Sequence, residues 1–184
     1  MSNVTAAKPQ VGGGIWMAPT GSTLPTDAST ALAAAFKSLG YVDEKGVTRA
    51  ISLDTQTVKA WGGAVVAVLQ NGKTETFRFR LLEPDNLDVL GLTFGEASGT
   101  LAEGITVKST RPEEKPQSFV ISMLEANNVH HRIVIPQGVV TNIGEIQYVD
   151  NKVEGFELTI TAIEDDAGNT AYDYLKTVTP SSNG

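Results

Sequence analysis

The sequence predicts a mainly β protein, an antiparallel β-sandwich or partial barrel with one or two short flanking helices. In Thr74–Leu81, Phe77 and Phe79 fall on one face while Thr76 and Arg78 fall on the other. This period of two indicates a half-buried strand. Most other apolar segments have strand length and are separated by short turns, which favours hairpins. The chain has 184 residues, of which 41% are hydrophobic and 19% charged, enough apolar material for the core of one domain.

The first element, residues 1–26, is expected to be an extended N-terminal arm, because its prolines and its three consecutive glycines disfavour regular pairing. Ile15, Trp16 and Met17 lie inside this arm. Three large apolar side chains in a loop gain free energy from a surface that removes them from water. That surface is either the core of the same subunit or a neighbouring subunit.

Two short helices are expected. In the first, which Thr26-Asp27 opens, Asp27 or Thr26 can cap the free amides of the first turn, and apolar residues recur at i, i+4 and i+7 from Leu32 to Leu39. Over Pro84–Phe94, the proline suits a first helical turn, and apolar residues again share one face.

A hairpin is expected over residues 63–82, with strands at Ala64–Leu69 and Thr74–Leu81. The turn between them is placed at Asn71-Gly72, because Asn-Gly is the strongest short hairpin signal. Further strands are expected at Ile105–Ser109, Ser118–Ala126, Arg132–Ile135, Val139–Val149 and Gly155–Ile163.

The charge balance excludes several classes of partner. There are 14 basic and 21 acidic residues, a net charge of −7 and a pI near 4.8. An acidic chain repels phosphates, so neither specific nucleic-acid binding nor an anionic membrane surface is expected. The start has no apolar secretion segment, and the apolar stretch Ala64–Leu69 is far shorter than the ~20 residues of a membrane span. We therefore expect a soluble intracellular product. With no cysteine, the chain has no disulfide and no thiolate.

Catalytic and metal-binding patterns are weak. His130 and His131 are neighbours in an expected strand, so they point to opposite faces and cannot chelate one metal. The acidic segment 164–169 lacks the ligand spacing of a calcium loop. In Gly95–Gly99, Ser98 stands one position too late for a nucleophile elbow. No nucleophile, base and oxyanion donor come together, so we expect neither an enzyme nor a cofactor.

Seven short segments are informative through their order and spacing. They are Trp16–Pro19, Gly21–Asp27, Ala35–Val42, Asp43–Val47, Lys59–Gly63, Arg132–Gly138 and Glu157–Ala162. Together they resemble the major tail protein, or tail tube protein, of long-tailed phages that infect actinobacteria and related Gram-positive hosts. The likeness covers about residues 11–175.

This resemblance implies a β-sandwich tail-tube domain over residues 27–176 and a flexible tail over 177–184. It implies homo-hexameric rings that stack into a tube, with a β-barrel lumen completed by strands from all subunits. Tape-measure protein and DNA would occupy the lumen transiently, and tail terminator and distal tail proteins would meet the tube ends. The protein would reside in the virion tail, and in the host cytoplasm during assembly.

Two groups of residues are the candidate sites for this role. Contacts between subunits or rings are expected at Ile15, Trp16, Met17, Trp61, Gly62 and Gly63. Lumen strands are expected to include Thr74, Glu75, Thr76, Arg78, Glu145 and Glu157. Because a conduit must not bind its cargo, we expect acidic side chains in the bore, where they would repel phosphates. Arginines on the same strand would then pair with carboxylates of neighbouring copies.

Two other readings fit the same features. The first is another virion ring or decoration protein, such as a tail terminator. The second is a binding module for cell-surface sugar, although aromatic residues, which such modules use as platforms, make up only 7% of the chain.

Overall fold

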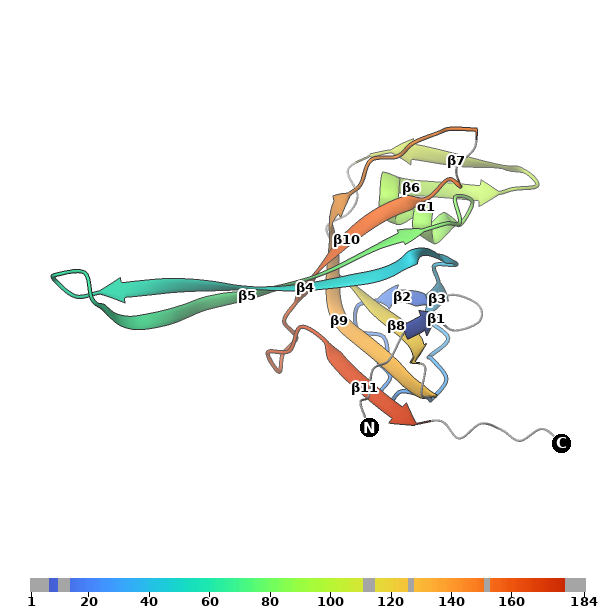
Figure 1. Cartoon of the computed structure of the whole chain (residues 1–184). Helices are drawn as coiled ribbons and strands as arrows, with labels where there is room; N and C mark the ends of the chain where they lie inside the picture. Colours follow the sequence, from blue (N-terminus) through green and yellow to red (C-terminus); the bar gives the residue numbers. More distant parts are fainter. Residues whose placement is uncertain (1–6, 10–13, 111–114, 126–127, 151–152, 178–184) are drawn as a thin grey trace.

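One bent antiparallel sheet makes up most of the computed structural model (Figure 1). The structure describes residues 7–9, 14–110, 115–125, 128–150 and 153–177. The sheet has the strand order β3-β2-β8-β9-β10-β5-β4, while β1 also pairs with β8 and β11 with β9. Its strands are β1 (Ala7–Pro9), β2 (Ile15–Pro19), β3 (Lys37–Ser38), β4 (Val42–Lys59), β5 (Val65–Leu81), β8 (Gln117–Glu125), β9 (Val129–Ile143), β10 (Phe156–Ile163) and β11 (Tyr172–Thr177). The mainly β, antiparallel prediction is confirmed.

Strand β9 joins the two halves of the sheet. Its first part pairs with β8 on one side and β11 on the other. Its second part, from residue 137, pairs with β10, which continues the sheet to β5 and β4. The core fills the space between the halves; its largest fully buried apolar side chains are Ile15, Leu39, Phe77, Leu81, Phe119, Ile135, Phe156, Leu158 and Ile160. Two separately predicted strands, Arg132–Ile135 and Val139–Val149, are thus one continuous strand that ends at Ile143.

The predicted alternation is confirmed where the strands cover this core. In β10 every second residue is buried, from Phe156 to Ala162, and the residues between are half-buried. In β5 the same pattern holds for Phe77, Phe79 and Leu81. Each of these strands has one apolar face on the core and one polar face, as period two requires.

The long hairpin β4–β5 corrects the predicted turn at Asn71-Gly72. The turn lies at residues 60–64, and β5 runs through the Asn-Gly pair without reversing. Asp54 pairs with Gly72 and Thr55 with Gln70, so Asn71 is the extra residue of a β-bulge. The turn preference of Asn71-Gly72 is outweighed by strand pairing. β4, which the sequence did not predict as a strand, pairs with β5 along its whole length.

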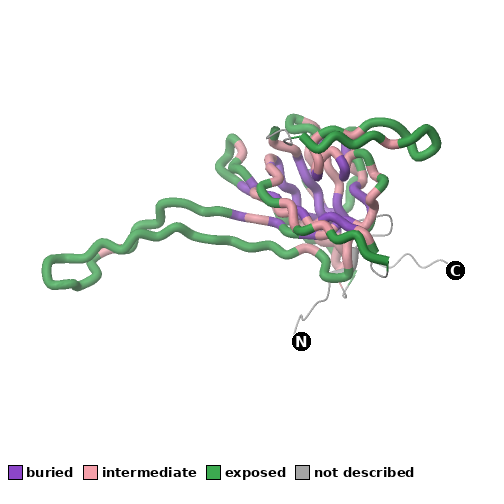
Figure 2. The backbone as a smooth tube through the Cα atoms, turned by 90° about the horizontal axis from the view of Figure 1, so that it is seen from above, coloured by how far each residue is buried: buried purple, intermediate pink, exposed green. Residues whose placement is uncertain are grey.

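The outer part of this hairpin projects from the body as an isolated two-stranded ribbon (Figure 1). We call residues 50–74 the distal hairpin. Apart from Ala67, all of them are exposed, on both faces of the ribbon (Figure 2).

The helix predicted over residues 27–39 is absent. Asp27 does accept hydrogen bonds from the amides of Ser29 (2.7 Å) and Thr30 (2.6 Å), but the chain continues as a loop. The buried guanidinium of Arg132 donates to the carbonyl oxygens of Asp27 (3.0 Å) and Thr30 (2.9 Å), and this tertiary contact holds the loop. Phe36 and Leu32 pack over Val120 and Val134 on the outer face of the half of the sheet that contains β8 and β11.

The second predicted helix is confirmed as α1 (Leu87–Phe94). Asn86 caps it, because its side chain accepts from the amides of Asp88 (3.0 Å) and Val89 (3.4 Å). Gly95 ends it at φ 102°, a conformation that glycine adopts without strain. A two-stranded sheet of β6 (Gly95–Thr100) and β7 (Gly104–Ser109) follows.

The N-terminal segment is part of the sheet in its described residues. β1 and β2 both pair with β8, so Ile15–Pro19 is a strand and not a detached arm. The C-terminal tail predicted over 177–184 lies outside the described residues except for Thr177, which ends β11. Among the described residues, no helix is long and apolar enough to cross a bilayer.

Candidate functional site

Three of the predicted contact residues form the tip of the long hairpin. The turn is closed by hydrogen bonds from the Ala60 amide to the Ala64 carbonyl (2.8 Å) and from the Gly63 amide to the Ala60 carbonyl (2.9 Å). Gly62 and Gly63 have φ values of 108° and 90°, which residues other than glycine rarely adopt. Trp61 is 107% exposed, so this subunit gives its indole no packing surface.

The other three predicted contact residues lie in β2, within the body. Ile15 is fully buried in the main core, which corrects its placement on a contact surface. Trp16 is half-buried beside Phe36 and Val120. The buried position of Ile15 follows from its pairing opposite Ile121 in the middle of the sheet.

The four-stranded layer β9-β10-β5-β4 has a second face that is polar and rich in threonine. The register places Thr159 beside Arg78, and Thr161 beside Thr76, on the side away from the buried aromatic residues. In β10, β5 and β4 the residues that alternate with the core positions on this face are Thr48, Ala50, Ser52, Thr74, Thr76, Arg78, Arg80, Glu157, Thr159 and Thr161. In β9, Val139 lies opposite Thr161 and Asn142 opposite Thr159.

Four of the six predicted lumen residues are on this polar face: Thr74, Thr76, Arg78 and Glu157. Glu75 is on the opposite face and fully buried. It lies two residues before Phe77 in the same strand, so both side chains point to the core. Its prediction as a bore residue is therefore wrong. Glu145 follows the end of β9 and is exposed.

Both edges of the four-stranded layer are unpaired among the described residues. β4 pairs only with β5, and residues 139–143 of β9 pair only with β10, since β8 leaves β9 at Gly138. Open edges present rows of free N–H and C=O groups that pair readily with another chain. The strand directions alternate through the layer, so its two edge strands run in opposite directions.

The root of the hairpin is held by an ionic cluster that the sequence did not predict. Arg49 Nε donates to Glu75 Oε1 (2.5 Å), and its Nη1 contacts Asp173 Oδ2 at 2.8 Å. Lys73 Nζ lies 2.9 Å from Glu75 Oε2, and the Thr170 hydroxyl donates to the same carboxylate.

These contacts set the ionisation of the cluster. Burial opposes the charge of Glu75, but hydrogen bonds from Thr170, Lys73 and Arg49 outweigh it and hold the carboxyl pKa below its ordinary value. Burial also opposes the charge of Arg49, and the hydrogen bonds to Asp173 and Glu75 reverse that effect and raise its pKa. Glu75 is therefore a buried carboxylate that stays charged because its neighbours donate to it.

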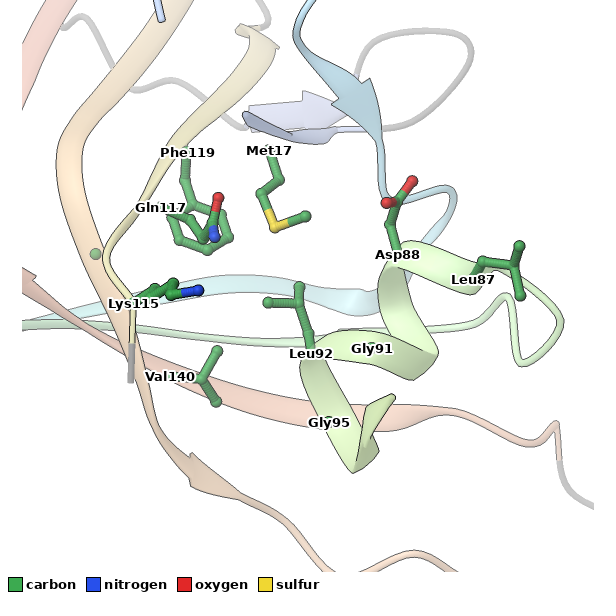
Figure 3. A pocket seen from close by; sticks show the side chains of 11 residues that line it. Met17, Leu87, Asp88, Gly91, Leu92, Gly95, Lys115, Gln117, Phe119 and Val140 are labelled. Atoms are coloured by element: carbon green, nitrogen blue, oxygen red, sulfur yellow. The ribbon is translucent and has the colours of Figure 1, made fainter. Parts of the chain in front are cut away.

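A hollow of about 250 Å³ lies beside α1 (Figure 3). Met17 and Phe119 point into it from the sheet and Leu92 from the helix, and Asp88 lies at its rim. Among the described residues around it, no nucleophile stands beside a base.

Comparison with known proteins decides the family. The sequence profile of the phage tail tube protein family matches residues 4–183. The chain belongs to the phage tail tube protein family. A search of curated proteins gives no match. Among solved structures, this tail tube protein is similar to a chain of the sheath–tube complex of an extracellular contractile injection system in its extended state. The TM-score is 0.44 at 10% identity, over 93% of each chain.

The tail tube protein is thus a structural subunit of a phage tail tube, which assembles from stacked subunits. The resemblance carried by the short segments is confirmed at the level of the family. Two features of the subunit were not predicted from the sequence. They are the edge strand β4 and the ionic cluster around Glu75. A signal for β4 was present, because Val47, Arg49, Ile51 and Leu53 alternate with small or polar residues.

Proposed function

We propose that this tail tube protein forms the wall of the tube by joining the two open edges of its four-stranded layer. β4 of one copy would pair with residues 139–143 of β9 in the next copy. The observation that carries this proposal is the alternation of strand directions. Because four is an even number, every junction between copies is antiparallel, as are the junctions within a copy. A repeated heterologous contact of this kind closes into a ring when its rotation closes.

The ring contains six copies, the number that the family resemblance implies. Its bore is lined by the polar face of the layer, because the other face is already buried in the subunit core. The lining consists mainly of hydroxyl groups, and its charged side chains are of both signs. Arg80 lies 3.5 Å from Asp43 and donates to the Val153 carbonyl (2.8 Å). Paired charges and hydroxyls offer a passing polyanion few places to displace its counterions.

This face modifies the expected acidic bore. Glu157 lies opposite Arg80, and Arg78 lies opposite Thr159. The charged side chains on this face are therefore of both signs without an acidic surplus, so repulsion of phosphates is not its main property. We propose that the tube carries DNA during ejection, and the tape-measure protein during assembly, because its wall binds neither tightly. The tail terminator and distal tail proteins would meet the tube at its two ends, where the hairpin tips, or the ring surface that the tips contact, have no further ring beside them. No catalytic activity, cofactor or membrane contact is part of this role.

The distal hairpin is the contact between stacked rings. Its apolar residues are exposed in the isolated subunit and are Ile51, Leu53, Val58, Trp61, Val65, Val66, Val68 and Leu69. A set of this kind marks a surface that another chain covers, and in a tube the available chain is a second copy.

Electron microscopy with site-directed cross-linking tests the edge pairing. The chain has no cysteine, so Thr48→Cys in the layer part of β4 and Thr141→Cys in β9 give single thiols on exposed residues. We expect tubes in concentrated protein, and dimers when the two variants are mixed and treated with a short thiol cross-linker. Ser98→Cys in β6 replaces Thr141→Cys as the control and should give none. Tubes in which only the control pair cross-links would contradict the proposal.

A further inference from the structure

The ionic cluster connects the long hairpin to the rest of the body. Arg49 and Glu75 face each other across the hairpin root, since Arg49 pairs opposite Phe77, and Glu75 opposite Ile51. Asp173 belongs to β11, at the other end of the chain. Beyond this point neither strand has a buried residue until the ribbon ends, so the cluster is the last place where the body grips the hairpin.

From Asp173 in β11 the cluster continues to His131 in β9 and Glu125 in β8. Asp173 Oδ1 lies 2.9 Å from Nε2 of His131, and Nδ1 of the same ring lies 3.1 Å from Glu125 Oε1. Both contacts are hydrogen bonds when the imidazole carries a hydrogen on each nitrogen. Strands β4, β5, β8, β9 and β11 thereby contribute to one chain of polar contacts.

We propose that Arg49 is the centre of an ionic latch that fixes the direction of the long hairpin relative to β11. Arg49 suits this position because its planar guanidinium donates to two carboxylates at once, one on the hairpin and one on the body. A two-stranded ribbon without its own core has little stiffness against bending at its root. Without the bridge, the body would still fold around its apolar core, but the hairpin would swing.

The latch also explains why a charge is buried here. Glu75 is fully buried, and Thr170, which is buried beside it, accepts from Lys73 (2.9 Å) while donating to Glu75. A charged pair whose hydrogen bonds are satisfied specifies one geometry more strictly than apolar packing does. For the tube, a fixed direction aims the hairpin tip at its contact before assembly. This consequence rests on the proposed function, whereas the latch itself is a property of the single subunit.

Distances between two spin labels on the isolated subunit test the latch. Thr57→Cys places one label on the distal hairpin and Ala31→Cys places the other on the body, both at exposed positions. In this background we compare Arg49→Lys and Asp173→Asn, because a lysine keeps the charge but cannot fork to both carboxylates. Glu96→Gln breaks the exposed Lys108–Glu96 pair (3.2 Å) of the β6–β7 sheet and is the matched control.

We expect one narrow distance distribution for the parent and the control, and a broadened or two-peaked distribution for both latch variants. Amide exchange at the root should also accelerate about tenfold, as expected of local opening. Circular dichroism confirms that each sample is folded, and if Arg49→Lys unfolds, Asp173→Asn, at a partly exposed site, carries the comparison. Folded latch variants with the parental distribution would overturn the proposal. If the parent gave the narrow distance distribution but formed no tubes, that result would instead count against the proposed function.

Discussion

The four-stranded layer and the distal hairpin share strands β4 and β5 but differ in what holds them. From residue 75 to Leu81, β5 alternates between buried and more exposed positions against a core. From Val65 to Thr74 the same strand is almost entirely exposed on both faces (Figure 2). A strand in the layer is therefore stabilised within the subunit, while the distal hairpin has only its ladder of backbone hydrogen bonds.

This difference separates folding from assembly along a single hairpin. Full burial of one large apolar side chain is worth roughly 1.5–3 kcal/mol, and the layer realises this gain in the monomer. The apolar residues of the distal hairpin are exposed in the monomer, so they gain this free energy only when a partner buries them. Substitutions in the two regions should accordingly affect different measurements.

The largest effect is expected in the layer, from Phe77→Ala. Phe77 is fully buried in the main core, and a Phe to Ala change at such a site costs about 3–5 kcal/mol, because transfer and cavity terms add. The free energy of unfolding, from denaturant titration of the dilute protein, measures it. Phe77→Leu, which keeps most of the volume, should cost clearly less. Equal stability of the alanine variant and the parent would show that the layer does not depend on this core.

Trp61→Ala should show the reverse pattern. The side chain is fully exposed in the subunit, so the unfolding free energy should stay within about 0.5 kcal/mol of the parent, as for surface changes. Subunit association should weaken by ~2 kcal/mol or more, the loss typical of a buried interface aromatic. Sedimentation over a concentration series gives the association.

Leu101→Ala is the matched control for that change. Leu101 is another exposed apolar residue, 72% accessible, in the turn between β6 and β7. It lies outside the long hairpin, so its loss should leave both folding and association unchanged. If Trp61→Ala lowered stability and association equally, the separation of the two regions would fail.

Glu75→Gln tests the point where the two regions meet. The amide cannot replace the carboxylate toward Arg49 and Lys73, so we expect a loss of roughly 1–3 kcal/mol at neutral pH, the range for a buried group left without its partner. The pKa of Glu75 is lowered in the folded protein. Its contribution to the free energy of unfolding is therefore fully present above the ordinary pKa of glutamate. This contribution is lost as the pH falls through the lower pKa of the folded state.

Acid titration of stability gives the sign of this effect. The parent should lose stability through that acidic range more steeply than Glu75→Gln, so that the two curves converge at low pH. Leu101→Ala, which changes no titratable group and lies at an exposed position, should run parallel to the parent at all pH values. Curves of Glu75→Gln and parent that stay parallel would contradict a charged Glu75.

The same contrast explains which elements could be predicted from the sequence. β5 near Phe77 and β10 were predictable because one face meets the core and the other does not, and this difference gives the sequence a period of two. β8 is buried on both faces and was predictable as a short apolar segment of strand length. β4 lacks such a contrast over most of its length, since both faces meet solvent in the subunit. The alternation from Val47 to Leu53 is a local signal for a strand, but the continuation of β4 to Lys59 depends on its pairing with β5.

Tertiary contacts account for the two local signals that failed. The Asn71-Gly72 pair became a bulge because β4 continues past it. The segment from Asp27 remained a loop because Arg132, more than 100 residues later, binds its carbonyl oxygens. For the site, the polar face of β5 was predictable from alternation. Glu75 was misplaced although its parity with Phe77 already put it on the core side.

The smallest effect is expected at the cap of α1, which belongs entirely to the body. The side chain of Asn86 accepts from two amides of the first turn and donates to the Ser38 carbonyl (3.3 Å). Asn86→Ala should lower the unfolding free energy by about 1 kcal/mol, the usual cost of an N-cap. Asn86→Asp, which keeps the acceptor oxygen, should cost less. Thermal melts measure both variants, and association at a fixed folded fraction should equal that of the parent. A loss of association in fully folded Asn86→Ala would mean that the body around α1 also takes part in assembly.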